Sequence, residues 1–163
     1  MTTYTKIDSP VGELLLVGEG TTLTSLSLPG QRNAPVVGAD WRRDDGAFGE
    51  AARQLSAYFT GRLPRFDLSL APAGTGFQQR VWRALDEIPY GTTTTYGELA
   101  ARLGVPRSEI RAVGAAIGAN PLLIVRPCHR VVGADGSMRG YAGGVEKKVR
   151  LLTLEGALQP MLG

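Results

Sequence analysis

The sequence predicts an α+β protein in which a small N-terminal antiparallel sheet with one helix precedes a C-terminal winged helix-turn-helix unit. Short apolar runs separated by turn residues near the N-terminus are typical of strands in such a sheet. Two helical patterns joined by a glycine-bearing turn, within residues 96–118, predict the helix-turn-helix. A turn at residues 135–136 between two short extended segments predicts a hairpin, which would form the wing.

The N-terminal elements follow from alternation and periodicity. Strands are expected over residues 3–8, 13–17, 22–28 and 66–70. Residues 29–46 are rich in Pro, Gly, Asp and Arg and lack periodicity, which predicts a long surface loop. Apolar residues recur at helical spacing from Phe48 to Phe59 and predict a helix that ends before Gly61. No catalytic cluster is recognisable in this part of the chain.

Residues 71–74, Ala-Pro-Ala-Gly, predict a domain boundary because this stretch is short, small and rigid enough to separate two packed units. We therefore expect an N-terminal domain over residues 1–70, a linker over 71–76 and a C-terminal domain over 77–163. A helix opens at once, because Thr75 and Gln78 have capping-box spacing. Its apolar stripe continues to Ile88, and Pro89 ends it.

The helix-turn-helix comprises expected helices over residues 96–103 and 107–118, joined by the turn at 104–106. Arg107 and Arg111 lie four residues apart, on one face of the second helix. Residues expected to face a core are Ala112, Val113, Ala116 and Ile117. Small residues that would let a nucleic-acid backbone come close are Gly114, Ala115 and Gly118. Helix pairs of this kind also occur in proteins that never bind DNA, so this alternative stays open.

The chain has a single cysteine and a single histidine, and they are adjacent, as Cys128 and His129. The thiolate is the reactive form of cysteine, and a free thiol with a pKa of about 8.5 needs a base or a cation to ionise at neutral pH. Alternatively, Cys128 is a small buried hydrophobe, because residues 122–125 are typical of a buried strand. Pro127 would end that strand and favours an exposed thiol. On extended backbone the two side chains point apart, so a water would have to bridge them.

After the short run Val131-Val132, the predicted hairpin leads to a last helix that ends at Glu155 and Gly156. We expect Val149 and Leu152 to point inward. The residues expected to point outward are Lys147, Lys148 and Arg150. A carboxylate at a helix C-terminus is unfavourable with respect to the helix dipole. We therefore interpret Glu155 as a residue that interacts with a partner group. The alternative is that its side chain is simply solvated.

The formal charge of +3 is unevenly distributed. Residues 1–74 carry seven Lys or Arg against eight Asp or Glu, whereas residues 75–163 carry eleven against seven. This basic, arginine-rich half is suited to phosphate recognition, although a solvated charged face would have the same composition. A lone cysteine excludes an internal disulfide and a multi-cysteine metal site. Without a membrane-length apolar run or a signal peptide, we expect a cytoplasmic protein with no membrane partner.

The C-terminal half contains a series of short motifs, at residues 74–78, 81–82, 88–91, Tyr96, 111–114, 120–121, 127–131 and 140–144. Through these motifs the chain resembles the O6-alkylguanine-DNA alkyltransferases, also called methylated-DNA–protein-cysteine methyltransferases. The N-terminal half matches this family loosely, through residues 7–12 and the helix bearing Leu55, Tyr58 and Phe59. The resemblance implies a ribonuclease-H-like N-terminal domain and a winged helix-turn-helix domain that carries the active-site cysteine.

The resemblance also implies a function. An alkyl group would pass once, irreversibly, from O6 of a flipped guanine in double-stranded DNA to Cys128, with O4-alkylthymine left open as a further substrate. His129 would act as base through a water and Glu155 would orient it. Tyr96 would donate a hydrogen bond to the guanine, and Arg111 would replace the flipped base in the stack. Minor-groove contacts would come from Arg107, Ala112, Gly114, Ala115 and Gly118. The hinge and pocket residues would be Asn120, Val131, Tyr141, Ala142 and Gly143.

No metal and no cofactor are expected, since the guanine itself is the leaving group. The protein would act as a monomer, with cooperative assembly on DNA left open. Two positions depart from the family pattern, because Arg126 stands where an apolar residue is usual and Ala142 where serine is frequent. Three other functions remain: a non-catalytic damage-sensing DNA binder, a cysteine hydrolase using Cys128, His129 and Glu155, and a winged-helix regulator. Cys128 argues against the first, since such sensors have tryptophan there.

Overall fold

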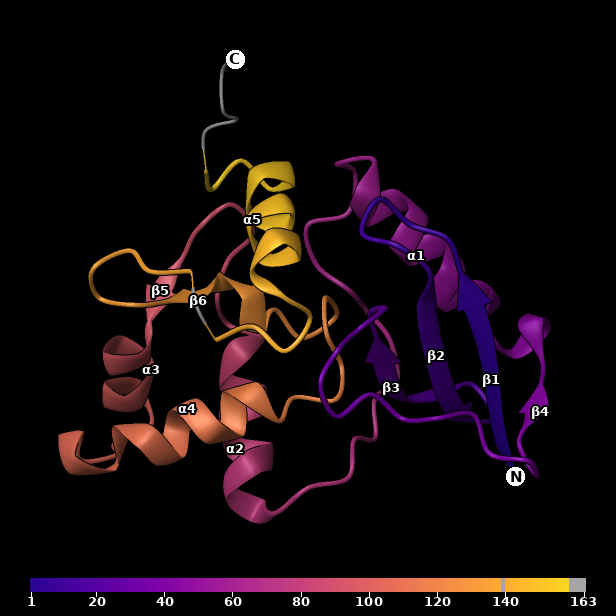
Figure 1. Cartoon of the computed structure of the whole chain (residues 1–163), viewed down its shortest axis with the longest axis horizontal. Coiled ribbons are helices and arrows are strands. Elements are labelled where there is room, and N and C mark those ends of the chain that lie inside the picture. Colours follow the sequence, from indigo (N-terminus) through magenta and orange to yellow (C-terminus); the bar gives the residue numbers. More distant parts are fainter. Residues whose placement is uncertain (139, 159–163) are drawn as a thin grey trace.

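The computed structural model describes residues 1–138 and 140–158, which form two parts lying side by side (Figure 1). The N-terminal part comprises β1 (Thr2–Ile7), β2 (Leu14–Glu19), β3 (Thr22–Ser27), β4 (Arg42–Arg43), η1 (Asp45–Phe48) and α1 (Gly49–Phe59). The C-terminal part comprises α2 (Gly76–Leu85), β5 (Thr94–Thr95), α3 (Tyr96–Arg102), η2 (Arg107–Glu109), α4 (Ile110–Gly118), η3 (Cys128–Arg130), β6 (Val131–Val132) and α5 (Val145–Leu154). The α+β class is confirmed.

The N-terminal sheet has the strand order β3-β2-β1-β4. The three predicted strands are present and pair antiparallel, with Thr5 opposite Leu16 and Leu16 opposite Leu26. The predicted antiparallel sheet is present, and it gains a fourth strand inside the expected loop, because β4 pairs with β1 in parallel. A side chain holds this segment, since the Thr5 hydroxyl donates to Asp45 Oδ1 at 2.6 Å. A strand of two arginines has no alternation for the sequence to show.

The predicted strand over residues 66–70 is absent, and only Leu70 forms a bridge, with Leu23. The side chain of Gln54, on α1, occupies both backbone groups of Asp67 instead. Its Nε2 donates to the Asp67 carbonyl at 2.8 Å, and its Oε1 accepts from the Asp67 amide at 2.8 Å. The backbone groups of Asp67 are therefore unavailable for a sheet ladder.

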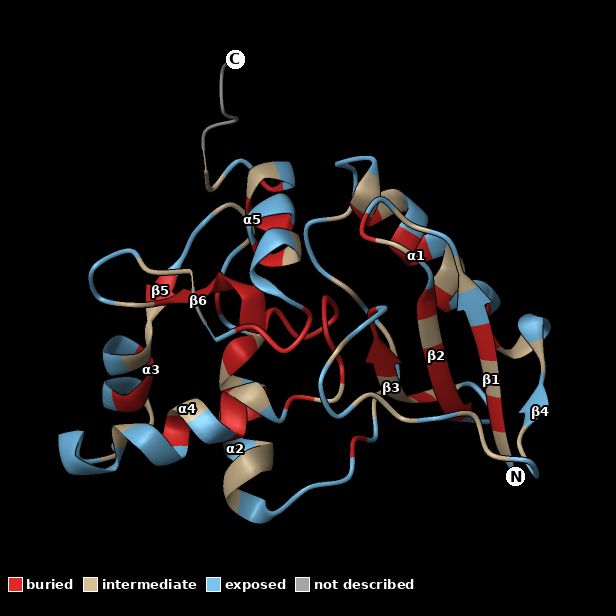
Figure 2. Ribbon diagram, in the orientation of Figure 1, coloured by how far each residue is buried: buried red, intermediate tan, exposed pale blue. Residues whose placement is uncertain are grey.

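A core of leucines joins β2, β3 and α1, and Tyr58 on α1 is fully buried at its edge. Figure 2 shows buried residues gathered on β2 and β3 and along the segment that leads into β6. That segment carries Leu122 and Leu123, which belong to the same core. The backbone of Leu26 contacts it directly, since the Leu26 amide donates to the Pro121 carbonyl at 2.9 Å. The two parts of the chain thus share one continuous core.

The predicted capping box at the start of α2 is confirmed, with Thr75 and Gln78 each accepting from the other's backbone amide. The helix ends at Leu85, earlier than predicted, and a turn continues to Ile88. The Trp82 indole, 1% exposed, donates to the Ala116 carbonyl at 2.8 Å. That hydrogen bond links α2 to the second helix of the helix-turn-helix.

The helix-turn-helix is confirmed as α3 followed by α4, but the first turn of the second helix, around Arg107, is the 3-10 helix η2. Val113, Ala116 and Ile117 are buried as expected. The expectation that Ala112 faces the core is wrong, because it lies next to Arg111 on the exposed side. Its small side chain is thereby left on the surface that was predicted to approach DNA.

The backbone around the cysteine differs from the prediction in two places. Residues 122–125 form a buried turn and not a strand, with Ile124 at a φ of 71°. The strand β6 pairs in parallel with β5 and forms no hairpin among the described residues. The predicted turn does exist, since the Gly136 amide donates to the Gly133 carbonyl at 2.9 Å. Arg139, in the expected second arm, lies outside the described residues.

The last helix, α5, is present, but two of its predicted orientations are wrong. Lys148 is 1% exposed and its Nζ donates to the Val131 carbonyl at 2.6 Å, whereas Val149 is 37% exposed. Lys148 lies one helical turn before the buried Leu152 and therefore shares its face. None of the helices in residues 1–138 and 140–158 is long and apolar enough to cross a membrane.

Candidate active site

The nucleophile segment is held by the amide of Asn120, which is 2% exposed. Its Nδ2 donates to the carbonyl of Arg126 at 3.0 Å and more weakly to that of Leu122 at 3.4 Å. Its Oδ1 accepts from the Leu122 amide at 3.0 Å. An asparagine suits this place because one side chain supplies both a donor and an acceptor. Asn120 thereby fixes the turn that leads from α4 to Cys128.

Cys128 begins the 3-10 helix η3 and is only 6% exposed. The prediction of an exposed thiol at a strand end is therefore wrong, because the turn through Ile124 folds the segment into the core. Burial raises the pKa of Cys128 to about 11, although Asn120 and the charge of Lys148 act in the opposite direction. The resting side chain is consequently a neutral thiol that needs a base to react.

His129 is fully buried and its Nε2 lies 2.7 Å from Glu155 Oε2. Burial lowers the pKa of His129 even though Glu155 acts to raise it, so the ring is neutral. Burial by itself would raise the pKa of Glu155, but donors from His129, Arg130 and Tyr58 outweigh it and hold that pKa at about 2. Because a carboxylate only accepts, the ring proton lies on Nε2. The other ring nitrogen, Nδ1, is then an acceptor, and it has no hydrogen-bond partner among the described residues.

Sequence reasoning left out two donors to Glu155. Arg130 donates from Nε to Oε1 at 2.8 Å and from Nη2 to Oε2 at 3.0 Å, and its Nη1 reaches the Ile88 carbonyl at 2.6 Å. Tyr58 donates its hydroxyl to Oε2 at 2.5 Å. The position of Arg130 directly after His129 could have indicated that it binds the same carboxylate. Tyr58 gave no such indication, because it occupies one of the apolar positions of a predicted helix.

Two tyrosines interact electrostatically with the thiol. Burial raises the pKa of Tyr96 and of Tyr141, and a negative charge on Cys128 raises both further. The Tyr141 hydroxyl is buried without a hydrogen-bond partner among the described residues. A Cβ built on Gly140 would lie 2.8 Å from the Tyr96 hydroxyl. The glycine loop therefore comes within contact distance of Tyr96.

The remaining predicted site residues fall into two groups. Val131, Ala142 and Gly143 are buried. A Cβ on Gly143 would lie 2.8 Å from the Tyr141 ring, so only glycine fits there without a shift. The second group lies on the helix-turn-helix, where Arg107, Arg111, Ala112 and Ala115 are exposed and Gly114 and Gly118 are half-buried. The structure thus brings Gly143 against Tyr141, whose ring centroid lies 6.4 Å from that of His129, and it places the predicted DNA-contact residues on η2 and α4.

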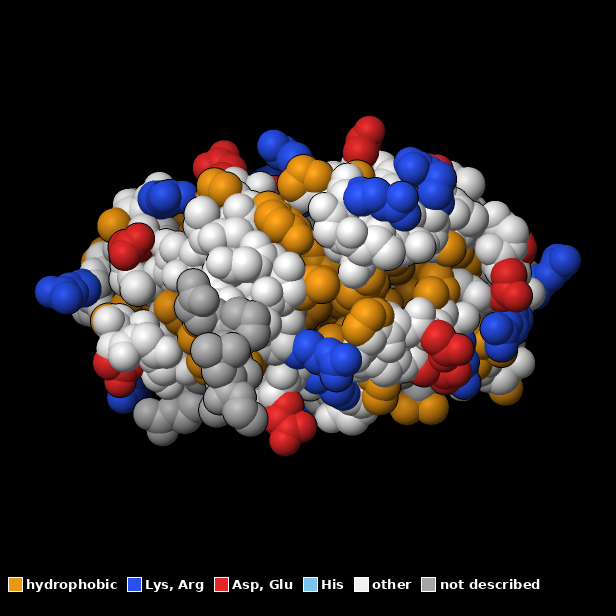
Figure 3. Space-filling model, turned by 90° about the horizontal axis from the view of Figure 1, so that it is seen from above, with side chains coloured by type: hydrophobic (Ala, Val, Ile, Leu, Met, Phe, Trp, Pro, Cys, Tyr) orange, Lys and Arg blue, Asp and Glu red, His pale blue; other side chains and the backbone are white. Residues whose placement is uncertain are grey.

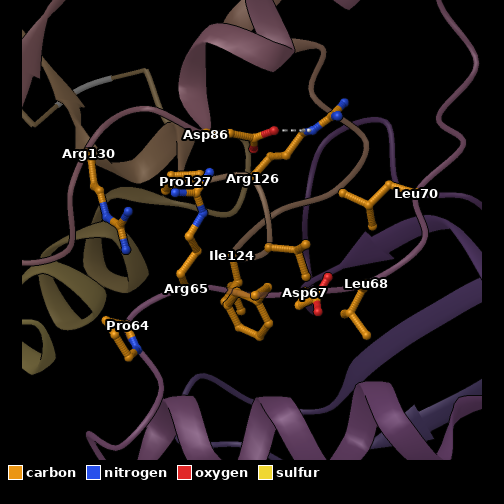
Figure 4. A pocket seen from close by; sticks show the side chains of 12 residues that line it. Pro64, Arg65, Asp67, Leu68, Leu70, Asp86, Ile124, Arg126, Pro127 and Arg130 are labelled. Carbon is orange, nitrogen blue, oxygen red and sulfur yellow. Dashed lines mark ion pairs between the residues drawn. The ribbon is translucent and has the colours of Figure 1, made fainter.

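The groove between the two parts of the chain is separate from the site of Cys128. From above, the surface is hollowed there, with hydrophobic side chains on the floor and Lys or Arg at the rims (Figure 3). A cavity of about 310 Å³ in it is lined by Arg65, Asp86, Arg126 and Arg130, but not by Cys128. Arg126 Nε lies 3.5 Å from Asp86 Oδ2, and the two side chains face each other (Figure 4). The unusual Arg126 therefore points into the groove and not at the thiol.

The described residues contain no group of three or more His, Cys, Asp or Glu side chains arranged to hold a metal ion.

Two domain matches decide the family. Residues 2–72 match the ribonuclease-like domain of 6-O-methylguanine DNA methyltransferase, and residues 76–157 match its DNA binding domain. The chain belongs to the 6-O-methylguanine DNA methyltransferase family.

Relatives in this family cover almost the whole chain. The methylated-DNA–protein-cysteine methyltransferase of Mycobacterium tuberculosis is 50% identical over 157 residues, which are 96% of this chain and 94% of the relative. The protein of that name from Methanosarcina barkeri is 51% identical over 152 residues, 93% and 96% of the two chains. The crystal structure of Mycobacterium tuberculosis OGT in complex with DNA aligns with a TM-score of 0.88 at 50% identity, covering 95% and 93%. The family predicted from the motifs is confirmed.

Proposed function

We propose that this protein repairs alkylated DNA by moving the alkyl group from O6 of guanine to Cys128, once per protein molecule. One observation carries the proposal: the only cysteine adjoins the only histidine, whose Nε2 is bonded to a buried carboxylate. Relatives at about half identity along nearly the whole chain carry the name of this activity. A lone nucleophile with a base and an orienting group is the arrangement that covalent transfer requires.

The step follows from the protonation states. His129 Nδ1, acting through a water, takes the proton of the Cys128 thiol as the sulfur attacks the alkyl carbon. The S–C bond forms while the C–O6 bond breaks, and the electron pair of that bond stays on the guanine. A hydrogen bond from Tyr96 stabilises the guanine as its charge changes. Because a thioether does not revert, Cys128 is consumed.

Burial of the thiol requires the base to leave the duplex. In paired DNA the O6 atom lies inside the helix, so the guanine has to be extruded at a cost of a few kcal/mol. We propose that Arg111 fills the vacated stack and that Arg107, Ala112, Gly114, Ala115 and Gly118 form the minor-groove contact surface. The pocket would be lined by Val131, Tyr141, Ala142 and Gly143, with Asn120 as the hinge. The partner we propose is double-stranded DNA, and the Mycobacterium tuberculosis relative that aligns with this chain was crystallised in complex with DNA.

We also propose a domain boundary, a cellular location and an oligomeric state. We place the linker at residues 71–76, since residues 71–75 contain no helix or strand and α2 opens at Gly76. We place the activity in the cytoplasm, because a free thiol nucleophile persists best in a reducing compartment. The protein would bind DNA as a monomer.

The test is intact-protein mass spectrometry after incubation with a duplex that contains one O6-methylguanine. Wild type should gain the mass of one methyl group and then saturate, while Cys128→Ser should gain none. Binding of the duplex without any gain in mass would favour a damage sensor. Continuing product release beyond one equivalent would instead favour a hydrolase.

A further inference from the structure

We propose that Tyr58 is a positioning residue for alkyl transfer, holding from the N-terminal part of the chain the Glu155 carboxylate to which His129 is bonded. This inference deepens the proposed function and rests on it. Tyr58 touches neither the thiol nor any expected substrate atom. It acts on the reaction through Glu155 and His129, so the N-terminal part would contribute to the chemistry as well as to the core.

The contact is built to be rigid. The Tyr58 hydroxyl donates to Glu155 Oε2 at 2.5 Å across 97 residues of sequence, and both residues are buried. The Tyr58 ring is held by three others, with ring centroids 5.1 Å away for Phe59, 5.3 Å for Phe66 and 6.2 Å for Tyr90. A tyrosine wedged in this way has little freedom to turn its hydroxyl elsewhere.

The Tyr58 hydroxyl binds the same carboxylate oxygen of Glu155 that is hydrogen-bonded to His129. Glu155 Oε2 is the atom bonded to His129, and it accepts from Tyr58 and Arg130 as well, whereas Oε1 accepts from Arg130. A donor on Oε2 withdraws charge from the atom that faces the imidazole. Without the Tyr58 hydroxyl, Oε2 would attract the His129 proton more strongly and would stabilise the imidazolium form better.

Loss of the Tyr58 hydroxyl would change the protonation of His129. A better stabilised imidazolium means a raised pKa of His129, so less of the neutral base is present at mildly acidic pH. The other ionisable groups that act on the pair would be unchanged; they are Arg130, Lys148, Tyr90 and Tyr141. A buried tyrosine that merely satisfies its hydroxyl would, in contrast, affect stability and leave the pH dependence of the reaction alone.

The experiment compares wild type, Tyr58→Phe and Tyr90→Phe as full-length chains. Tyr90 is the matched control, because it belongs to the same ring cluster but its hydroxyl makes no hydrogen bond to Glu155. The readout is the single-turnover rate of Cys128 alkylation by free O6-benzylguanine between about pH 4.5 and 9, a range that includes the ordinary histidine pKa and the region below it into which burial moves His129. This substrate needs no base flipping, so changes in DNA binding do not enter the rate.

In Tyr58→Phe, the acidic limb of the profile should move about one pH unit toward alkaline, as expected for a lost hydrogen bond to a charged group. On the acidic side of the wild-type midpoint the rate should then fall roughly five- to tenfold, with a change below about twofold at the alkaline plateau. Tyr90→Phe should superimpose on wild type. Because His129 is the only histidine, its Nε2 proton resonance is unambiguous, and it should move downfield in Tyr58→Phe as the hydrogen bond to Oε2 strengthens.

A Tyr58→Phe profile identical to wild type, or a loss of equal size at every pH, would overturn the positioning role. An unchanged His129 proton resonance would do the same, and this measurement requires only a folded protein. If wild type itself fails to alkylate Cys128, the proposed function fails instead. The two failures are therefore distinguishable.

Discussion

Glu155 Oε2 and His129 Nε2 lie 2.7 Å apart, with both side chains fully buried and the carboxylate at the end of the last helix. A carboxylate in that place opposes the helix dipole, and three donors compensate it. The same contacts that stabilise Glu155 therefore fix the tautomer of His129. Glu155 is thus unfavourably placed with respect to the helix dipole but holds the histidine in the tautomer that the proposed reaction needs.

Replacing Glu155 with Gln should slow alkylation of Cys128 strongly, because an amide no longer ensures that Nε2 carries the ring proton. It should also destabilise the protein by about 3 kcal/mol, because the buried Arg130 would lose its counter-charge. Rates with free O6-benzylguanine and urea unfolding would measure the two effects separately. A Gln variant with wild-type rate would exclude Glu155 as the orienting group.

Stability should fall as the pH is lowered, in two stages. The lowered pKa of His129 means that the unfolded chain binds that proton more readily, so stability declines below about pH 6.5, the ordinary histidine value. The lowered pKa of Glu155 adds a second loss, beginning below the ordinary value of 4.5 and continuing toward about 2. Urea midpoints measured from neutral to acidic pH test this. In Glu155→Gln the second stage should be weaker, and an equally steep decline would contradict the assignment.

Arg111→Ala should reduce repair of O6-methylguanine in duplex DNA more than reaction with free O6-benzylguanine. Only duplex repair requires an extruded base and a filled gap in the stack. Single-turnover rates on the two substrates give the comparison. Equal losses on both would argue against a role for Arg111 in flipping.

Arg107→Ala should weaken binding to undamaged duplex DNA uniformly across sequences and reduce the slope of log affinity against log salt by about one. The side chain is exposed at the start of the second helix of the helix-turn-helix, where a phosphate contact is accessible. Titrations at several salt concentrations measure the slope. Arg53→Ala, on the remote helix α1, serves as control and should leave it unchanged.

Gly140→Ala should slow alkylation, because its Cβ would displace the Tyr96 hydroxyl, 2.8 Å away. Gly136→Ala is the matched control, since its φ of 83° resembles the 96° of Gly140 but no atom lies within 4 Å of its Cβ. Both variants should lose about 1 kcal/mol of stability from the positive φ. Only the first should lose activity, and equal rates in the two would remove the steric argument.

The local elements were predictable because their causes are local. The capping box at Thr75 and Gln78 and the pairing of the first three strands depend on residues close in sequence. The errors have non-local causes. Residues 66–70 failed to form a strand because Gln54 takes the backbone groups of Asp67, and Lys148 points inward because the Val131 carbonyl accepts from it. Neither partner can be read from the pattern of the segment itself.

The order of the residues establishes which reactive groups this protein has: one thiol beside one imidazole, a helix-turn-helix ahead of them and a glutamate at the end of α5. How those groups are controlled depends on contacts that form when the chain folds. Folding buries the thiol, assigns the ring proton of His129 and brings Tyr58 onto Glu155 from 97 residues away. The physical reason is that pKa values depend on burial and on nearby donors in space, whichever part of the chain supplies them.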